Sequence, residues 1–197
     1  MKSYDYQHRQ GVQEITWDGF AEMTAKLTEA LAAEKIDLIL GIARAGLFPA
    51  TAVSLALRRE LYPVRVTRRV QDVVQYESPI WRVDVPATVA TQRVAVIDEI
   101  ADSGETLAIV ASRALERGAR QALTVSLVSH SWADPRPDLT ALISDALIIF
   151  PWDRRVYQDD KWQTHPEIEA ALATQKFSPM GEANLDLKVI EFFVEAT

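Results

Sequence analysis

Cysteine is absent from the 197 residues of this sequence. A disulfide framework and a thiolate nucleophile are therefore excluded, and a reducing, cytoplasmic location is the one we expect. Basic residues are also in deficit, because 28 acidic side chains against 21 basic ones give a formal net charge of −7. Without a basic face, nucleic acid is not expected as a partner.

Long apolar segments are missing as well. The first ten residues have no apolar stretch of the kind that a signal peptide needs. The longest apolar run near the C-terminal end covers residues 146–152, which is far too short to span a bilayer. We therefore expect no membrane partner.

What the sequence does contain is an alternation of apolar strands and amphipathic helices. Apolar runs predict about five strands, at residues 36–43, 61–69, 93–98, 122–129 and 145–150. Helical periodicity predicts helices after Asp18, over 47–60 and over 105–119, with Asp18 as an N-cap and Gly118 as a C-cap. Such alternation predicts an α/β fold with a central, mostly parallel sheet flanked by helices. From residue 153 the alternation stops, apart from a helix expected near 166–175.

A dense group of acids follows the third predicted strand, in the segment VAVIDEIADSGET (residues 94–106). Its four carboxylates belong to Asp98, Glu99, Asp102 and Glu105. In open α/β sheets, ligands bind beyond the carboxyl ends of the strands, which is where this group lies. The N–H groups of residues 103–106 start the next helix and, with the Ser103 and Thr106 hydroxyls, form a cradle for phosphate.

Paired acids beside such a cradle can accept hydrogen bonds from sugar hydroxyls or hold Mg²⁺. One short segment thus offers places for a phosphate, a diol and a divalent cation, which together suit a phosphorylated sugar. The plainer alternative is a solvated acidic loop that caps a helix.

This segment resembles the 5-phosphoribosyl diphosphate (PRPP) motif of type I phosphoribosyltransferases. In that motif a hydrophobic strand leads into two acids, two further residues, Asp and Ser/Thr-Gly-x-Thr. Three other segments are similar to the xanthine/hypoxanthine–guanine branch of the family: ITWDGF (15–20), GIARAG (41–46) and IIFPWD (148–153). The resemblance implies the fold of that family, with a small hood formed by the N- and C-terminal segments. It implies a domain over residues 1–155 and a C-terminal extension over 156–197 that packs on it.

The resemblance also implies a reaction and a set of PRPP contacts. The reaction is Mg²⁺-dependent transfer of the phosphoribosyl group from PRPP to a free base, a purine, by a homo-oligomer that acts on small molecules. Asp98 and Glu99 are expected to bind the ribose hydroxyls and the metal. The 5-phosphate is assigned to Ser103, Gly104, Glu105 and Thr106, and the diphosphate to Arg44, Ala45 and Gly46, with a cis peptide expected between residues 43 and 44. Arg68 or Arg69 is a further diphosphate candidate.

Asp102 is expected to be the catalytic residue, because the matching family position lies near the base and manages its proton. The base site is assigned to His130, Leu147, Ile148 and Asp153. His130 stands where 6-oxopurine enzymes place a Lys, and Leu147 stands where they place an aromatic ring. These departures predict weak activity on 6-oxopurines or a preference for another base, although His130 can also be an ordinary loop histidine.

Two alternatives remain open from the sequence. Residues 69–90, which are apolar and contain Pro79 and Pro86, form either a mobile lid that excludes water or a subunit contact. The whole protein can also be a PRPP- or nucleotide-binding regulator that has this fold and little or no catalysis.

Overall fold

The computed structural model describes residues 9–67, 69–70, 73–76, 79–165 and 168. The chain divides into two compact units, which are treated one at a time below. The described part of the first unit is residues 22–67, 69–70, 73–76 and 79–144, and that of the second is residues 9–21 with 145–165 and 168. Within this described part, no helix is long and apolar enough to cross a membrane.

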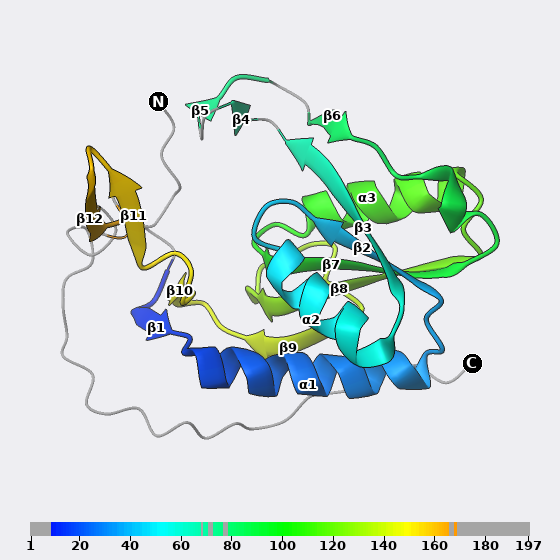
Figure 1. Cartoon of the computed structure of the whole chain (residues 1–197), viewed down its shortest axis with the longest axis horizontal. Coiled ribbons are helices and arrows are strands. Elements are labelled where there is room, and N and C mark those ends of the chain that lie inside the picture. The colour runs from blue at the N-terminus through cyan, green and yellow to red at the C-terminus, as the bar shows by residue number, and fades with distance from the viewer. Residues whose placement is uncertain (1–8, 68, 71–72, 77–78, 166–167, 169–197) are drawn as a thin grey trace. The chain divides into compact units, whose positions relative to one another are not determined.

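A six-stranded sheet with the order β6-β3-β2-β7-β8-β9 forms the centre of the first unit (Figure 1). Its strands are β2 (Leu38–Ile42), β3 (Glu60–Thr67), β6 (Ile80–Val83), β7 (Arg93–Ala101), β8 (Gln121–Ser129) and β9 (Leu139–Ile143). All neighbouring pairs are parallel except β3 and β6. The predicted α/β fold with a mostly parallel sheet is therefore confirmed.

Two helices cover opposite faces of this sheet, α2 (Leu47–Leu57) and α3 (Glu105–Glu116) (Figure 1). From the adjacent strands β2 and β7 the chain moves apart, through α2 to β3 and through α3 to β8. Right-handed crossovers in opposite directions place their helices on opposite faces. The carboxyl ends of β2 and β7 are consequently the switch point of the sheet, where ligands of open α/β folds bind.

The sheet and its helices are closely packed. Gly41 in β2 has no space for a side chain, since a Cβ there would lie 2.8 Å from the Cβ of Ala50 in α2. On the α3 side, Leu40, Val96 and Val110 are fully buried in one apolar cluster. Helix α1 (Trp17–Ala33) adds Met23, Leu27 and Leu31 to the core.

The prediction of a sheet strand at residues 145–150 is wrong. That stretch forms β10 (Leu147–Ile149), which pairs in parallel with β1 (Val12–Glu14) in the second unit. The edge position of the sheet belongs to β9, which is only partly buried. Its Thr140 hydroxyl hydrogen-bonds the Ser126 hydroxyl at 3.0 Å. A short edge strand that contains the polar residue Thr140 lacks the continuous apolar run by which the central strands were recognised.

One predicted helix cap is correct and one is not. The N-cap of α1 is Thr16, whose hydroxyl accepts a hydrogen bond from the Gly19 N–H at 3.0 Å, while Asp18 lies in the first turn. Gly118, predicted as the C-cap of α3, has φ +90° just past the helix. The Gly118 and Ala119 N–H groups donate to the carbonyls of Leu115 and Ala114. This pattern is the left-handed glycine ending of a helix.

The described residues between 69 and 90 are more regular than expected. A short hairpin of β4 (Arg69–Val70) and β5 (Val73–Val74) is followed by β6 and by the 3-10 helix η2 (Ala87–Val89). Val85 and Val89 are buried in the core cluster, so the second half of this stretch belongs to the body of the unit. Apart from Ile168, the helix expected near 166–175 lies outside the described residues.

The second unit combines N- and C-terminal segments of the chain. Besides the β1–β10 pair it has a hairpin of β11 (Arg155–Gln158) and β12 (Lys161–Thr164). The rings of Phe150 and Trp152 are stacked at 4.8 Å between centroids, and the edges of Trp17 and Phe20 complete an aromatic cluster. This cluster holds the ends of β1 and β10 together.

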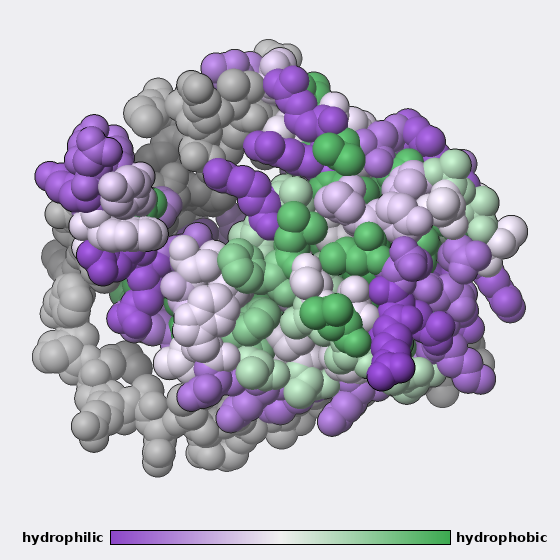
Figure 2. Space-filling model, in the orientation of Figure 1, coloured by the Kyte–Doolittle hydropathy of each residue, from purple (hydrophilic) through white to green (hydrophobic). Residues whose placement is uncertain are grey.

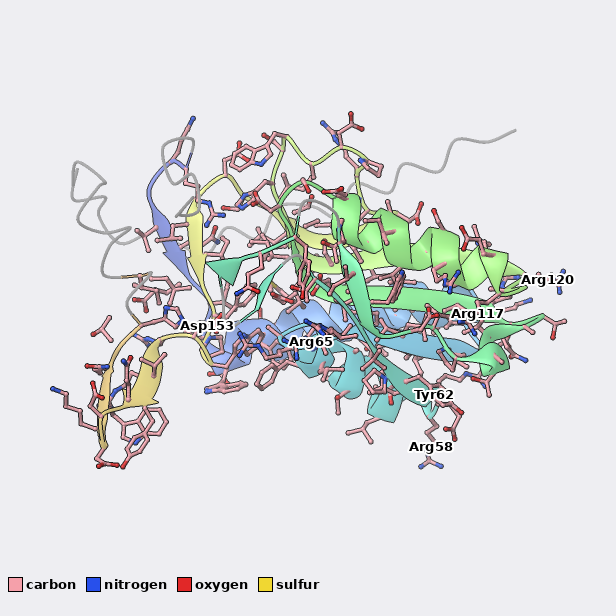
Figure 3. The ribbon with its side chains drawn as sticks, turned by 90° about the horizontal axis from the view of Figure 1, so that it is seen from above. Arg58, Tyr62, Arg65, Arg117, Arg120 and Asp153 are labelled. Carbon is pink, nitrogen blue, oxygen red and sulfur yellow. The ribbon has the colours of Figure 1, made fainter. Side chains whose placement is uncertain are left out.

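An ionic cluster joins α3 to the loop after β6 in the first unit. Asp84 accepts hydrogen bonds from Arg113 at 2.8 and 3.0 Å and also from Arg117, at the C-terminal end of α3 (Figure 3). The hydrogen bonds from Arg113 hold the pKa of Asp84 far below its usual range. Because the folded-state pKa is depressed, the cluster stabilises the fold above about pH 4 and is lost as the pH falls below that value.

We expect Asp84→Asn to lower the unfolding midpoint at pH 7 by about 2–4 °C, since a pair about a third exposed contributes ~1 kcal/mol after solvent screening. The difference from wild type should shrink below pH 4. Thermal unfolding followed by circular dichroism at pH 7 and pH 3 measures both quantities. Glu29→Gln, on the exposed side of α1, serves as the control. An equal deficit at both pH values would contradict the linkage.

Candidate functional site

Two loops meet at the switch point of the sheet. One follows β2 and contains residues 43–46, and the other is the end of β7 with residues 98–104. A Cβ on Gly46 would lie 2.6 Å from Oδ1 of Asp98 and 2.9 Å from its Cα. The loops therefore touch, and they can do so only because residue 46 has no side chain. The structure thus brings together the predicted diphosphate loop and the first acid of the predicted pair.

The loop after β2 leads directly into a helix. The peptide between Ala43 and Arg44 is cis, which confirms the expectation. The Ala43 N–H donates to the carbonyl of Val64 in β3 at 2.8 Å, and the Leu47 N–H donates to the carbonyl of Arg44 at 3.1 Å. Arg44 itself is exposed. A guanidinium beside the N-terminus of α2 makes this end of β2 attractive to anions.

The acid pair lies within β7, which is longer than predicted. Asp98 pairs with Ser126 of β8, and both Asp98 and Glu99 are half-buried. Oδ1 of Asp98 accepts a hydrogen bond from the Glu99 N–H at 2.9 Å. Burial, and next to it the charge of Glu99, raise the pKa of Asp98 well above its usual range. An ionised Asp98 is thus unfavourable here unless a cation or hydrogen-bond donors offset its charge.

The same acids fit a divalent cation that a ligand helps to hold. Within the described residues, no three His, Cys, Asp or Glu side chains are grouped as a metal site. Mg²⁺, however, is commonly bound by one or two carboxylates together with the oxygens of a phosphorylated substrate. Asp98, whose charge lacks compensation, and Glu99 beside it meet that description.

The segment assigned to the 5-phosphate lies at the start of α3. Ser103 and Thr106 are exposed, and Gly104 has φ +80° immediately before the helix. The Glu105 N–H donates to the Ser103 hydroxyl at 3.3 Å, so one of the predicted phosphate donors is engaged within the loop. The first N–H groups of a helix have no carbonyl partners inside it and can bind an anion.

A third loop, residues 130–135 after β8, packs against the loop that precedes α3. Its backbone is joined to the loop after β7 by hydrogen bonds from the His130 N–H to the Ala101 carbonyl, 3.1 Å, and from the Asp134 N–H to the Ser103 carbonyl, 3.0 Å. The carbonyl oxygen of Pro135 fills the space beside Gly104, where a Cβ would lie 1.9 Å away. A side chain at position 104 would therefore separate the two loops.

Asp102 lies in the loop after β7, with its side chain 46% exposed. Its Oδ1 accepts a hydrogen bond from the indole N–H of Trp132 at 3.3 Å. The ring of His130 is stacked under that indole, is itself buried, and binds the Ser144 carbonyl through Nδ1 at 2.6 Å. Because a carbonyl can only accept, the His130 proton resides on Nδ1.

The other predicted base residues belong to the second unit. Leu147 lies in β10, is buried, and donates its N–H to the Gly11 carbonyl at 2.9 Å. Ile148 is half-buried in the same strand. The N–H of Asp153 donates to the Phe150 carbonyl at 3.0 Å, closing a turn. Their assignment to a base site stays a prediction.

Sequence reasoning passed over two residues that lie at this edge of the sheet. Trp132 could have been noticed as a large aromatic side chain just beyond the carboxyl end of a central strand. Arg65 is exposed in β3 (Figure 3) and directly follows Val64, which binds the loop after β2. Of the second cations proposed from the sequence, Arg68 lies outside the described residues and the side chain of Arg69 is not described.

Comparison with known proteins agrees with this geometry. Residues 12–159 match the family model described as a phosphoribosyl transferase domain. No curated protein matches the sequence. The solved structure of a purine phosphoribosyltransferase from Pyrococcus horikoshii OT3 is similar, with 27% identity and a TM-score of 0.65 over 72% of this chain and 93% of that one.

Two more distant structures share the fold. The xanthine-guanine-hypoxanthine phosphoribosyltransferase of Helicobacter pylori has 16% identity and a TM-score of 0.62 over 82% of this chain and 99% of that one. A hypothetical protein from Neisseria gonorrhoeae with bound ppGpp has 20% identity and a TM-score of 0.63 over 85% of this chain and 99% of that one.

We expect Gly104→Ala to weaken the binding of inorganic phosphate and PRPP at least tenfold and to lower the unfolding midpoint. The added Cβ would clash with the Pro135 carbonyl oxygen, and the alanine would have to adopt the positive φ of residue 104. Gly118→Ala is the matched control, because it has the same backbone strain, ~1–2 kcal/mol, while its nearest neighbour is 3.7 Å away. Calorimetric titration and thermal unfolding provide the measurements. Equal behaviour of the two variants would show that the packing of Gly104 is unimportant.

We expect Asp98→Asn to raise the unfolding midpoint of the ligand-free protein by a few degrees at pH 8, the effect of about 1 kcal/mol. Since the pKa of Asp98 is raised by folding, wild type loses stability as the pH rises from about 4 through that pKa. The variant lacks this loss, so its advantage should be smaller at pH 4.5 than at pH 8. A midpoint below that of wild type at pH 8 would disprove this electrostatic explanation.

Proposed function

Because the chain belongs to the phosphoribosyl transferase domain family and is a phosphoribosyltransferase, we propose that it transfers the phosphoribosyl group of PRPP to a ring nitrogen of a purine, with Mg²⁺ as cofactor. The observation that carries the proposal is the contact between the loop after β2 and Asp98 at the switch point, with a helix N-terminus following each loop. Two anion sites on either side of an acid pair match a sugar with phosphates at both ends.

In this proposal each part of PRPP has its own segment. The 5-phosphate lies at the start of α3, with Ser103, Gly104, Glu105 and Thr106. The diphosphate lies at the start of α2, with Arg44, Ala45 and Gly46. The ribose hydroxyls donate hydrogen bonds to Asp98 and Glu99, whose unfavourable proximity is thereby relieved.

The reaction needs no protein nucleophile. The bond between C1 of the ribose and the diphosphate oxygen breaks, and the oxygen leaves with the electron pair. A ring nitrogen of the base forms the new bond to C1, and its proton goes to the Asp102 carboxylate. Arg44 offsets charge on the departing diphosphate, and the two helix N-termini hold the ends of PRPP in place. Bound Mg²⁺ supplies further neutralisation of the leaving group, held by Asp98 and Glu99 together with substrate oxygens.

A purine is the proposed acceptor because the similar enzyme from P. horikoshii, 27% identical, is named as a purine phosphoribosyltransferase. His130, Leu147, Ile148 and Asp153 remain the proposed base residues. The structure adds a reason to expect poor recognition of a 6-oxo group. His130 is covered by Trp132, and its protonated nitrogen is already bound to the Ser144 carbonyl. A neutral His130 therefore has an acceptor, not a donor, at Nε2.

A homo-oligomer in the cytoplasm completes the proposal. Figure 2 shows apolar side chains gathered over α2 on the face of the first unit that it displays. Phe48 is 41% exposed and Leu55 is 73% exposed there. A second copy covering this face would remove exposed apolar area from water.

The decisive experiment incubates the purified protein with PRPP, Mg²⁺ and single bases, namely adenine, hypoxanthine, guanine and xanthine. Formation of a nucleoside monophosphate and diphosphate is expected with at least one purine, and low turnover with the 6-oxopurines. Binding of PRPP without turnover on any base would instead indicate the regulatory alternative. Efficient turnover of guanine or hypoxanthine would show that the base site has been misplaced.

We expect the double variant Asp98→Asn with Glu99→Gln to bind PRPP more weakly by roughly a hundredfold or more, since each charged hydrogen bond contributes ~1.5–3 kcal/mol. The dependence of binding on Mg²⁺ should disappear with it. Titration of PRPP with and without Mg²⁺ measures both effects, and Asp159→Asn on the hairpin after β11 is the control. An unchanged titration would refute the assigned role of the acid pair.

A further inference from the structure

We propose that Trp132 is a positioning residue for Asp102. Its indole N–H binds one oxygen of the Asp102 carboxylate and so fixes the orientation in which that carboxylate takes the proton of the base. The inference rests on the function proposed above, in which Asp102 is the proton acceptor.

The contact between the two side chains has a defined polarity. Nε1 of Trp132 lies 3.3 Å from Oδ1 of Asp102. An indole N–H can only donate, so the carboxylate oxygen is the acceptor. The distance is at the long end of the range for such a bond, as is common in catalytic sites without substrate, where contacts tighten once the complex forms. The bond therefore favours one orientation of the Asp102 carboxylate.

The indole is itself fixed in place. Its ring lies on the His130 ring, with the centroids 4.4 Å apart and the planes 16° from parallel. Trp132 is nevertheless 40% exposed, whereas His130 is 1% exposed. The indole is thus held on a buried ring while part of it stays exposed beside Asp102.

His130 connects this arrangement to the sheet. Its Nδ1–H donates to the Ser144 carbonyl at 2.6 Å, beyond the end of β9, and its backbone N–H donates to Ala101 at the end of β7. The Ser144 N–H in turn donates to the Ser129 carbonyl at the end of β8. Three neighbouring strand ends thus fix the imidazole. The imidazole supports the indole, and the indole holds the carboxylate.

The geometry favours action through Asp102 over direct stacking on the base. The N–H edge of the indole, not its face, is directed at the carboxylate. One face of the indole is occupied by the imidazole, whose Nε2 lies 3.9 Å from the same Oδ1. The indole N–H is thus the donor that faces Oδ1 of Asp102, and the indole face is turned away from that carboxylate.

The test uses Trp132→Phe, which keeps a ring to stack on His130 and removes only the N–H donor. With the best base from the panel, kcat should fall about three- to tenfold, the effect of one lost hydrogen bond to a charged group. The KM for PRPP and the unfolding midpoint should stay close to wild type, which a purely structural role would not allow. Trp162→Phe, in the exposed hairpin of the second unit, is the matched control. Unchanged kcat in Trp132→Phe would overturn the proposal.

A double-mutant cycle with Asp102→Asn separates this inference from the proposed function. If Trp132 acts through Asp102, the double variant should be no slower than Asp102→Asn alone. Losses that multiply, or a KM for the base that rises with Trp132→Phe, would mean that the indole acts elsewhere and would overturn the proposal. Full turnover by Asp102→Asn would instead refute the role of Asp102 itself, and the inference would fall with it.

Discussion

The site depends on a steric condition at two positions where backbone meets backbone. Residue 46 must lack a side chain for Asp98 to approach the start of α2. Residue 104 must lack one for the loop after β8 to pack against the start of α3. Both contacts occur at the ends of strands that are buried and parallel, so neither strand can shift to accommodate a side chain. The position of each helix N-terminus follows from these two contacts. The proposed phosphate sites are thus consequences of close packing as much as of charge.

The same close packing leaves an unfavourable electrostatic interaction between Asp98 and Glu99. Asp98 and Glu99 are consecutive residues at the half-buried end of β7, and burial keeps solvent from screening them fully. The Asp84 cluster is the opposite case, since each of its carboxylate oxygens meets a guanidinium. Asp84 is stabilised by cations within the fold, whereas Asp98 needs a ligand or a metal ion to offset its charge. Such a contrast is typical of a functional site in an otherwise satisfied structure.

Much of the fold was predictable because local patterns report burial. The central strands are continuous apolar runs and Gly118 ends a helix, so these features were predicted correctly. Strand β9 was missed because it is a short, partly buried edge strand whose apolar residues are interrupted by Thr140. The pairing of β10 with β1 depends on contacts between distant segments, which no local pattern encodes. For the site, the motif of residues 94–106 predicted the loop that we assign to the 5-phosphate, whereas the contact of Trp132 with Asp102 required the relative placement of two loops.

The proposed phosphate sites after β2 and β7 draw on the peptide backbone, on glycines and on helix ends, all of which the fold itself supplies, in addition to their side chains. The assigned base contacts rely on individual side chains. Substitutions of the base-site residues can therefore change the acceptor base without changing the binding of PRPP. Proteins that inherit this arrangement can change their acceptor base by single substitutions, because the fold itself retains the binding of the phosphoribosyl donor.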